Sequence, residues 1–321
     1  MSAGSLLEYA TGRDDDMKLG FVSAILDDWS FEEALDVAAS LGYECMEVAC
    51  WPQGPAERRY AGVSHIDVEA LDDNTVRTIQ GLCEKSGVDI SALSFYPNVM
   101  DADRKKADAA RRHLERVLEA ANKLAVGCVT TFIGRDQHKT VEENLKRFVE
   151  VWGPLIAKAE SLSVKIAIEN CPMLFGPEQW PGGQNLATTP EIWRRMFELL
   201  PSAAFGINYD PSHFVWQMMD YISPLYEFKN RIFHVHFKDI KLYQDKLRQV
   251  GSMAYPLAYM SPKLPGLGDV NWGKYVSALT DIGYDGPACV EVEDRAFEGS
   301  REKVLESLRL SKKYLSQFVP R

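Results

Sequence analysis

The sequence predicts one α/β domain built as a closed (β/α)8 barrel of parallel strands. Short apolar runs alternate with longer amphipathic runs eight times along the 321 residues, as strands and helices do in such a barrel. No glycine-rich dinucleotide fingerprint follows the first run, which disfavours the runner-up, an open doubly wound sheet. Without a linker or repeat to divide the chain, we expect a loose polar leader at 1–18 and one catalytic domain at 19–321.

The predicted elements follow one another in regular order. The strands are expected at 19–26, 43–50, 88–96, 127–133, 164–170, 204–210, 231–238 and 288–293. The helices are expected at 31–41, 68–85, 102–124, 141–161, 191–200, 222–228 and 300–318. Ser30 is a good N-cap for the first helix and Gly42 a good residue to end it, while Pro190 suits the first turn of the fifth.

Three connections are longer than an ordinary loop, and each follows a predicted strand. They span 51–67, 171–188 and 240–271. In a barrel of this kind such connections lie on the catalytic face. Aromatic residues in them, Trp51, Trp180 and Tyr243, are candidates to line a pocket, and Trp180 is a predicted substrate contact.

Composition excludes several classes of partner. The formal net charge is -10 with no basic tract, which disfavours nucleic acid, and no run of about 18 apolar residues could cross a membrane. The six cysteines have no CxxC spacing, which is typical of reduced, buried thiols in a cytoplasmic protein. We therefore expect a small-molecule enzyme of the cytoplasm.

The predicted strand 231–238 is the segment around which the site is organised. Side chains alternate faces along a strand, so His236 lies opposite an apolar row. The same alternation turns Glu169, Asp210, Glu291 and Glu47 toward the barrel axis, near the carboxyl ends of four other strands. Barrel enzymes place their chemistry at these ends.

Several carboxylates and an imidazole at one barrel mouth repel one another and resist burial unless a cation compensates. A divalent metal is the simplest compensation, and mixed oxygen and nitrogen donors favour manganese, cobalt, magnesium or iron over a thiolate-type zinc site. The alternative is a set of internal salt bridges with Lys238, Arg135 or Lys165.

Four motifs carry a family resemblance from about residue 18 to residue 318. They are Ile-Ala-Ile-Glu-Asn at 166–170, Asn-Tyr-Asp-Pro-Ser-His at 208–213, His-Val-His-Phe-Lys-Asp at 234–239 and Tyr-Asp-Gly-Pro-Ala-Cys-Val-Glu at 284–291. In this order they resemble the sugar isomerase/epimerase family with the xylose-isomerase-like TIM barrel. The family also includes inosose dehydratases, ketose 3-epimerases and, more distantly, apurinic endonucleases.

The resemblance implies a set of residue roles. Glu169, Asp210, His236 and Glu291 would be the metal ligands, with manganese first and cobalt or magnesium as alternatives. Glu293 remains an alternative to Glu291 because both face inward and the register is open. His213 would contact either the metal or the substrate.

The chemistry implied is removal of a proton next to a sugar carbonyl, giving an enediolate. Glu169 and Glu291 would be the two catalytic carboxylates. Return of the proton to a neighbouring carbon gives an isomerase, and return to the other face gives an epimerase. Expulsion of a group β to the carbonyl gives a lyase.

One stretch favours the lyase. Residues 130–138 resemble the large subunit of C-glycoside deglycosidases, which cleave 3-oxo-glycosides by β-elimination with a small second subunit. His138 would be the base in that case; the alternative is a solvent-exposed loop histidine. An apurinic-type endonuclease is a remote alternative, because the second strand ends in Glu47 rather than histidine and the overall charge is acidic.

The remaining candidates bind substrate. They are His213, Lys238, Glu47, Arg135 and Trp180. Lys238 and Asp239 are also candidates to orient His236, since metal-bound imidazoles need an acceptor on the other nitrogen. His234, one layer deeper, is predicted to be a hydrogen-bonded core residue. The family is commonly multimeric, so we expect a homo-oligomer, or a hetero-oligomer with a small subunit if the protein is a deglycosidase.

Overall fold

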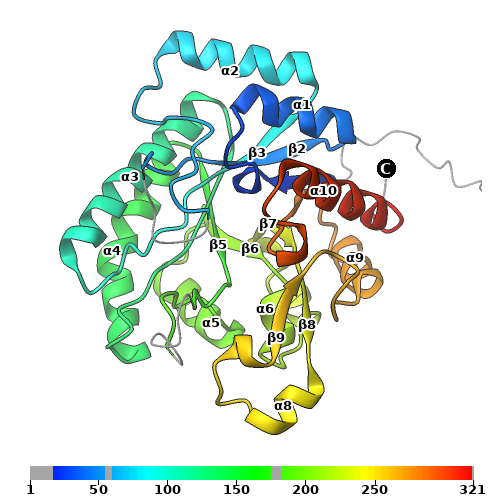
Figure 1. Ribbon diagram of the computed structural model, residues 1–321. Coiled ribbons are helices and arrows are strands. Elements are labelled where there is room, and N and C mark those ends of the chain that lie inside the picture. The colour runs from blue at the N-terminus through cyan, green and yellow to red at the C-terminus, as the bar shows by residue number, and fades with distance from the viewer. Residues whose placement is uncertain (1–16, 55–59, 175–181, 320–321) are drawn as a thin grey trace, which may run out of the picture.

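Eight parallel strands close into a barrel in the computed structural model, which describes residues 17–54, 60–174 and 182–319 (Figure 1). The order around the barrel is β1-β10-β7-β6-β5-β4-β3-β2. These strands are β1 (Lys18–Val22), β2 (Cys45–Ala49), β3 (Asp89–Ser94), β4 (Cys128–Thr131), β5 (Lys165–Glu169), β6 (Phe205–Tyr209), β7 (Ile232–Phe237) and β10 (Pro287–Val290). Because β1 pairs with both β2 and β10, the sheet has no free edge and the open-sheet alternative is wrong.

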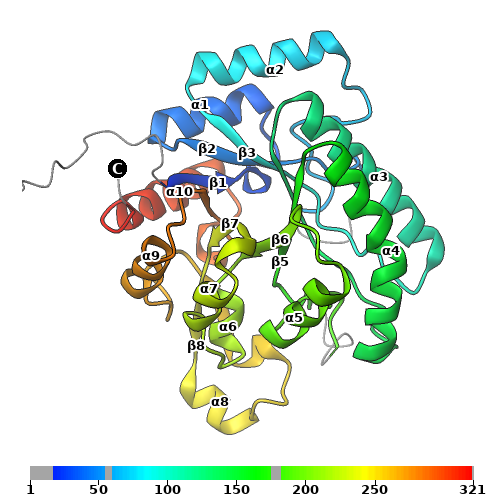
Figure 2. The ribbon, with the colours of Figure 1, turned by 180° about the vertical axis from the view of Figure 1, so that it is seen from behind.

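Helices surround the barrel and bury their apolar faces against it (Figures 1 and 2). They are α1 (Phe31–Leu41), α2 (Asp73–Ser86), α3 (Arg104–Lys123), α4 (Val141–Ser161), α5 (Pro190–Leu199), α6 (Ser212–Trp216), α7 (Ser223–Glu227), α9 (Trp272–Asp281) and α10 (Arg301–Leu315). The predicted capping holds for α1, where Ser30 and Glu33 form a capping box and Gly42 ends the helix with φ 75°. α10 packs beside α1, so the two ends of the barrel domain meet.

The connection after β7 differs from the expected irregular loop. It forms an antiparallel hairpin of β8 (Asp239–Leu242) and β9 (Met260–Lys263), with α8 (Gln244–Val250) between them. The hairpin extends from the barrel at the bottom of Figure 1. Two helices were also not predicted: the short α6, and α9, which follows the hairpin. A five-residue helix is too short for a periodic signal, which explains the first omission.

The expected leader falls almost entirely outside the described residues. Its last two residues are described, and they belong to the barrel: Met17 is buried and Lys18 begins β1, paired with Pro287. The described part of the barrel domain therefore begins at Met17, two residues before its predicted start. Within the described ranges, no helix is both long and apolar enough to span a membrane.

Candidate metal centre

Four strand ends bring the predicted ligands together. Glu169 is the last residue of β5, Asp210 follows β6, His236 lies in β7 and Glu291 follows β10. One donor atom from each of the four lies within 4.8 Å of the others. Glu293, the alternative to Glu291, does not belong to this group of potential ligands. Strand alternation therefore locates the cluster, because neighbouring parallel strands end on the same face.

Several atoms of this cluster are buried without a hydrogen-bond partner. They are Glu169 Oε1, Asp210 Oδ2 and His236 Nδ1. His236 Nδ1 lies 3.4 Å from Glu291 Oε2 and 3.7 Å from Glu169 Oε1. The two carboxylate oxygens make only ion-pair contacts, with Lys238 and His213, and one divalent cation would bind all three atoms at once. Three carboxylates and one imidazole are a donor set that suits manganese, cobalt or magnesium. The residues present fit a divalent ion.

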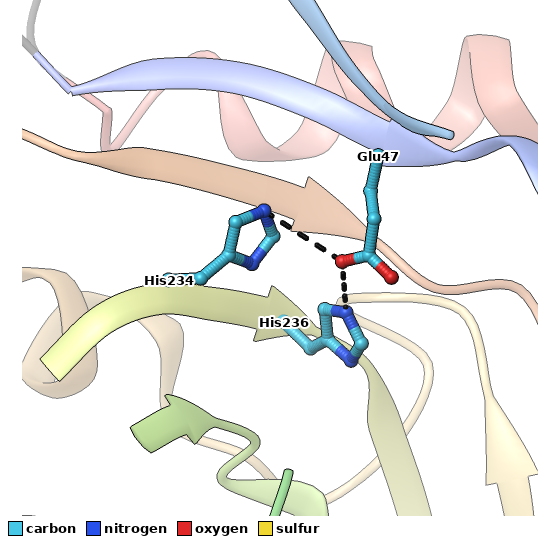
Figure 3. A group of neighbouring side chains, drawn as sticks. All are labelled: Glu47, His234 and His236. Atoms are coloured by element: carbon cyan, nitrogen blue, oxygen red, sulfur yellow. Dashed lines mark hydrogen bonds and ion pairs between the residues drawn. The ribbon is translucent and has the colours of Figure 1, made fainter. Parts of the chain in front are cut away.

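Glu47 sets the orientation of His236 from the far side of the barrel (Figure 3). Its Oε2 lies 2.8 Å from His236 Nε2, and its Oε1 accepts a hydrogen bond of 2.7 Å from Tyr96. Because the carboxylate holds Nε2, the other nitrogen, Nδ1, faces the cluster. Glu47 is fully buried and does not line the pocket. In this structure it orients His236, the role that the sequence assigned to Lys238 and Asp239.

Two neighbours complete the support beneath His236. His234 is a hydrogen-bonded core residue, as predicted: its Nδ1 lies 3.1 Å from Asn208 Oδ1 and its Nε2 lies 3.2 Å from Ser91 Oγ. Asn208 also contacts His236 Nε2 at 3.0 Å. Alternation had turned Asn208 inward, but no sequence signal links it to His236.

Lys238 lies among the same carboxylates. Its Nζ is 2.7 Å from Glu291 Oε2, 3.1 Å from Asp210 Oδ2, 3.3 Å from Glu293 Oε2 and 3.8 Å from Glu169 Oε1. The predicted alternative of internal salt bridges therefore exists, and Lys238 forms them. Lys165, also considered for this role, instead lies over the Phe233 ring at 4.7 Å.

The environment moves the cluster's carboxyl pKa values in opposite directions. Burial raises the pKa of Glu169, but the Lys238 ammonium and the two nearby imidazoles outweigh burial and hold it well below the usual range. Burial is also the largest influence on Glu291 and, together with the charges of Glu169 and Glu293, raises its pKa despite the opposing Lys238 ammonium. Asp210 is buried too, yet Lys238 and His213 lower its pKa to about 2. The two glutamates thus differ in basicity within one site.

Acid should destabilise the metal-free protein partly through Asp210. Its folded-state pKa of about 2 lies below the ordinary value of 3.8, so its contribution is present above pH 4 and is lost as the pH falls toward 2. A shift of this size corresponds to about 2 kcal/mol of unfolding free energy. Urea unfolding between pH 2 and pH 5 of the wild type and Asp210→Asn measures it. An equal pH slope in both proteins would contradict the assignment.

A pocket of about 100 Å³ opens above the cluster, with Glu169, Lys238 and Glu291 in its lining. Aromatic side chains form much of the wall: Trp51, Tyr60, Tyr96 and Phe132. Trp51 was predicted to line a pocket and does so. Apolar walls around a few converging polar groups are typical of small-molecule sites.

Among the described residues, Arg135, His138 and Asp239 are not part of the pocket lining. Arg135 is half-buried and donates through its guanidinium to the carbonyls of Gly182 and Lys139, so it stabilises a loop. His138 is an exposed residue of the β4–α4 loop. Trp180 lies outside the described residues. Asp239 accepts hydrogen bonds from the backbone at Gly266 and from the Trp272 indole, which ties β8 to the segment before α9.

The chain belongs to the family of xylose isomerase-like TIM barrels, whose model matches residues 35–314. The uncharacterised protein YfiH of Bacillus subtilis is 25% identical over 312 residues, which is 87% of this chain and 93% of that protein. The inosose dehydratase of Clostridium tetani is 30% identical over 137 residues, 42% of this chain and 45% of the dehydratase.

Solved structures share the fold. The D-psicose 3-epimerase of Clostridium cellulolyticum H10, crystallised with D-tagatose, superposes with a TM-score of 0.70 at 15% identity and covers 95% of this chain and 100% of the epimerase chain. The IolI protein with a bound zinc atom has a TM-score of 0.71 at 19% identity, over 95% of this chain and 100% of that one.

Proposed function

We propose that this protein is a divalent-metal-dependent sugar isomerase or epimerase that removes a proton beside the carbonyl of a sugar or keto-sugar. The observation that carries the proposal is the pair Glu169 and Glu291, which converge on one cluster at the pocket and have pKa values displaced in opposite directions. Two titratable groups separated in this way are suited to act as a base and an acid. The likeness to a D-psicose 3-epimerase supports a sugar substrate.

Each residue has a distinct role in this proposal. Glu169, held as a carboxylate, takes the proton from the carbon next to the carbonyl, and Glu291 delivers a proton to the product. Lys238, released from the carboxylates when the ion binds, donates a hydrogen bond to a substrate oxygen. Manganese, or cobalt or magnesium, held by Glu169, Asp210, His236 and Glu291 would supply positive charge for the enediolate oxygens.

A lyase is the second candidate, and the sequence similarity to inosose dehydratases favours it. The same carbanion would expel a group β to the carbonyl, so the first step would be shared. In the deglycosidase form of this candidate, His138 would act on a large glycoside from its exposed position on the loop after β4. That form would also require a small second subunit.

Solvent isotope exchange separates these candidates. The manganese-loaded protein is incubated in deuterated buffer with a panel of ketoses, inososes and 3-oxo-glycosides, and the products are read by NMR and mass spectrometry. Deuterium beside the carbonyl of an intact sugar is the expected result, and the labelled carbon distinguishes isomerase from epimerase. Release of water or an aglycone would establish the lyase instead. Absence of both across the panel would contradict the proposed function.

A further inference from the structure

His213 lies at the edge of the metal centre with its two ring nitrogens in different surroundings. The indole nitrogen of Trp216 donates a hydrogen bond of 3.3 Å to His213 Nδ1. On the other side of the ring, Nε2 lies 3.2 Å from Asp210 Oδ2 and 3.3 Å from Glu169 Oε1, within ion-pair distance but without the geometry of a hydrogen bond. His213 and Trp216 are both buried, 7% and 4% exposed, so neither contact is exchanged freely with water.

These partners assign the position of the imidazole proton. An indole N–H is only a donor, so His213 Nδ1 must offer a lone pair to it. The proton of the neutral ring then resides on Nε2, where two carboxylate oxygens can accept it. A proton on Nδ1 would set two N–H groups against each other in a buried contact.

His236 has the opposite arrangement. Its Nε2 lies 2.8 Å from the Glu47 carboxylate and 3.0 Å from the Asn208 amide nitrogen. The carboxylate is the shorter and charged contact, so it assigns the proton to Nε2, which in His236 points away from the cluster. The nitrogen that His236 presents to the cluster, Nδ1, is therefore a lone pair. The nitrogen that His213 presents is an N–H. One histidine is suited to bind a cation and the other to donate a hydrogen bond.

We propose that Trp216 is a positioning residue that keeps the His213 proton on Nε2, where it faces the carboxylates of Glu169 and Asp210, and that His213 is not a metal ligand. This assignment argues against a second cation site. Its residues would be Glu169, Cys171 and His213, whose donor atoms lie within 4.8 Å of one another. With the Nε2 lone pair absent, that group has only two donors. This role adds detail to the proposed function. It rests on that function in one respect, because it takes Glu169 to be the catalytic base.

Histidine NMR tests the tautomer directly. The protein has six histidines, so uniform ¹⁵N-histidine labelling gives few resonances, and His213→Gln identifies those of His213. The zinc-loaded protein is used because zinc is diamagnetic. We expect a protonated Nε2 and an unprotonated Nδ1, and we expect Trp216→Phe to shift the Nδ1 resonance and to mix the two tautomers. A proton on Nδ1 in the wild type would overturn the proposal.

The matched control is Trp193→Phe. Trp193 is also buried, its indole donates to the Ala187 carbonyl at 2.9 Å, and it packs against the Phe214 ring of the same short helix. Its replacement removes an indole N–H without touching His213, so the His213 resonances should stay unchanged. An equal shift in both variants would show that loss of packing, and not loss of the N–H, moves the signal, and would refute the role of Trp216.

Metal content gives an independent test that does not require Trp216 variants to fold. Equilibrium dialysis with manganese, followed by elemental analysis, counts ions per chain. We expect His213→Gln to keep one ion with an affinity reduced by no more than about 10- to 100-fold, as for residues that contact the ligands without binding the metal. His236→Ala should lose more than about 100-fold. Equal loss in both variants would make His213 a ligand. A failed sugar-exchange experiment would not change the histidine NMR or the metal content. The role of His213 and the proposed isomerase or epimerase activity can therefore be refuted separately.

Discussion

Replacing Glu169 by glutamine is expected to remove the bound divalent ion and to lower the rate of isotope exchange into the sugar by about 10³-fold or more, in the range of a lost general base. Glutamine keeps the shape of the side chain but replaces one buried carboxylate oxygen with an NH2 group. That group has no lone pair for a cation or a proton and would point hydrogens at Lys238 and His213, which lie 3.8 Å and 3.3 Å away. Elemental analysis and the exchange assay measure the two losses.

Glu293→Gln is the matched control for metal content. Glu293 also follows β10 and contacts Lys238 at 3.3 Å, but its side chain is 32% exposed and it is not part of the ligand group. We expect this variant to retain the ion, and we expect Glu291→Gln to lose it. Circular dichroism should show an unchanged fold in all three. Retention of a full metal complement by Glu169→Gln would refute the ligand assignment.

Strand alternation explains how much of the site was predictable. Each ligand lies at the end of a short apolar run with period two, so the sequence indicates which side chains face the barrel axis. Barrel closure then brings Glu169, Asp210, His236 and Glu291 to one face, and their convergence follows without knowledge of the loops. Both steps use patterns that can be recognised in one sequence: side-chain alternation within a strand and the repeated order of strands and helices.

Contacts across the barrel were not predictable in the same way. Glu47 and His236 are 189 residues apart and lie on strands that are not neighbours in the barrel order. Alternation turns both inward but does not say which inward side chains meet, since that depends on the tilt and stagger of the strands. The roles of Tyr96 and Asn208 were missed for the same reason.

Loop positions were the least predictable part. His138 was placed on the active face because it follows β4, but the segment between β4 and α4 leaves its side chain exposed. Position after a strand selects a face of the barrel and not the direction of a side chain on it. The hairpin β8–β9 shows the same limit: its strands are only four residues long, with no clear apolar alternation.

Replacing Lys238 by methionine should have opposite effects on the metal-free and metal-loaded proteins. Without metal, the carboxylates of Glu169, Asp210, Glu291 and Glu293 lose their ammonium partner, and such loss in a buried ion pair costs about 3–5 kcal/mol of unfolding free energy. With manganese, the carboxylates regain a cation. Lys238→Met should therefore be less stable than the wild type after chelation, and bound manganese should stabilise it more strongly.

Thermal denaturation at several manganese concentrations measures this exchange of one cation for another, since stabilisation grows with the ratio of ligand to its Kd. Lys263→Met is the matched control, because Lys263 also pairs with a buried carboxylate, Asp294 at 3.3 Å, which does not belong to the ligand group. That variant should show no change in its response to manganese. If Lys238→Met responded to manganese as weakly as the control, the ammonium and the ion would not compete. In that case Lys238 would stay paired with the carboxylates in the ion-loaded site.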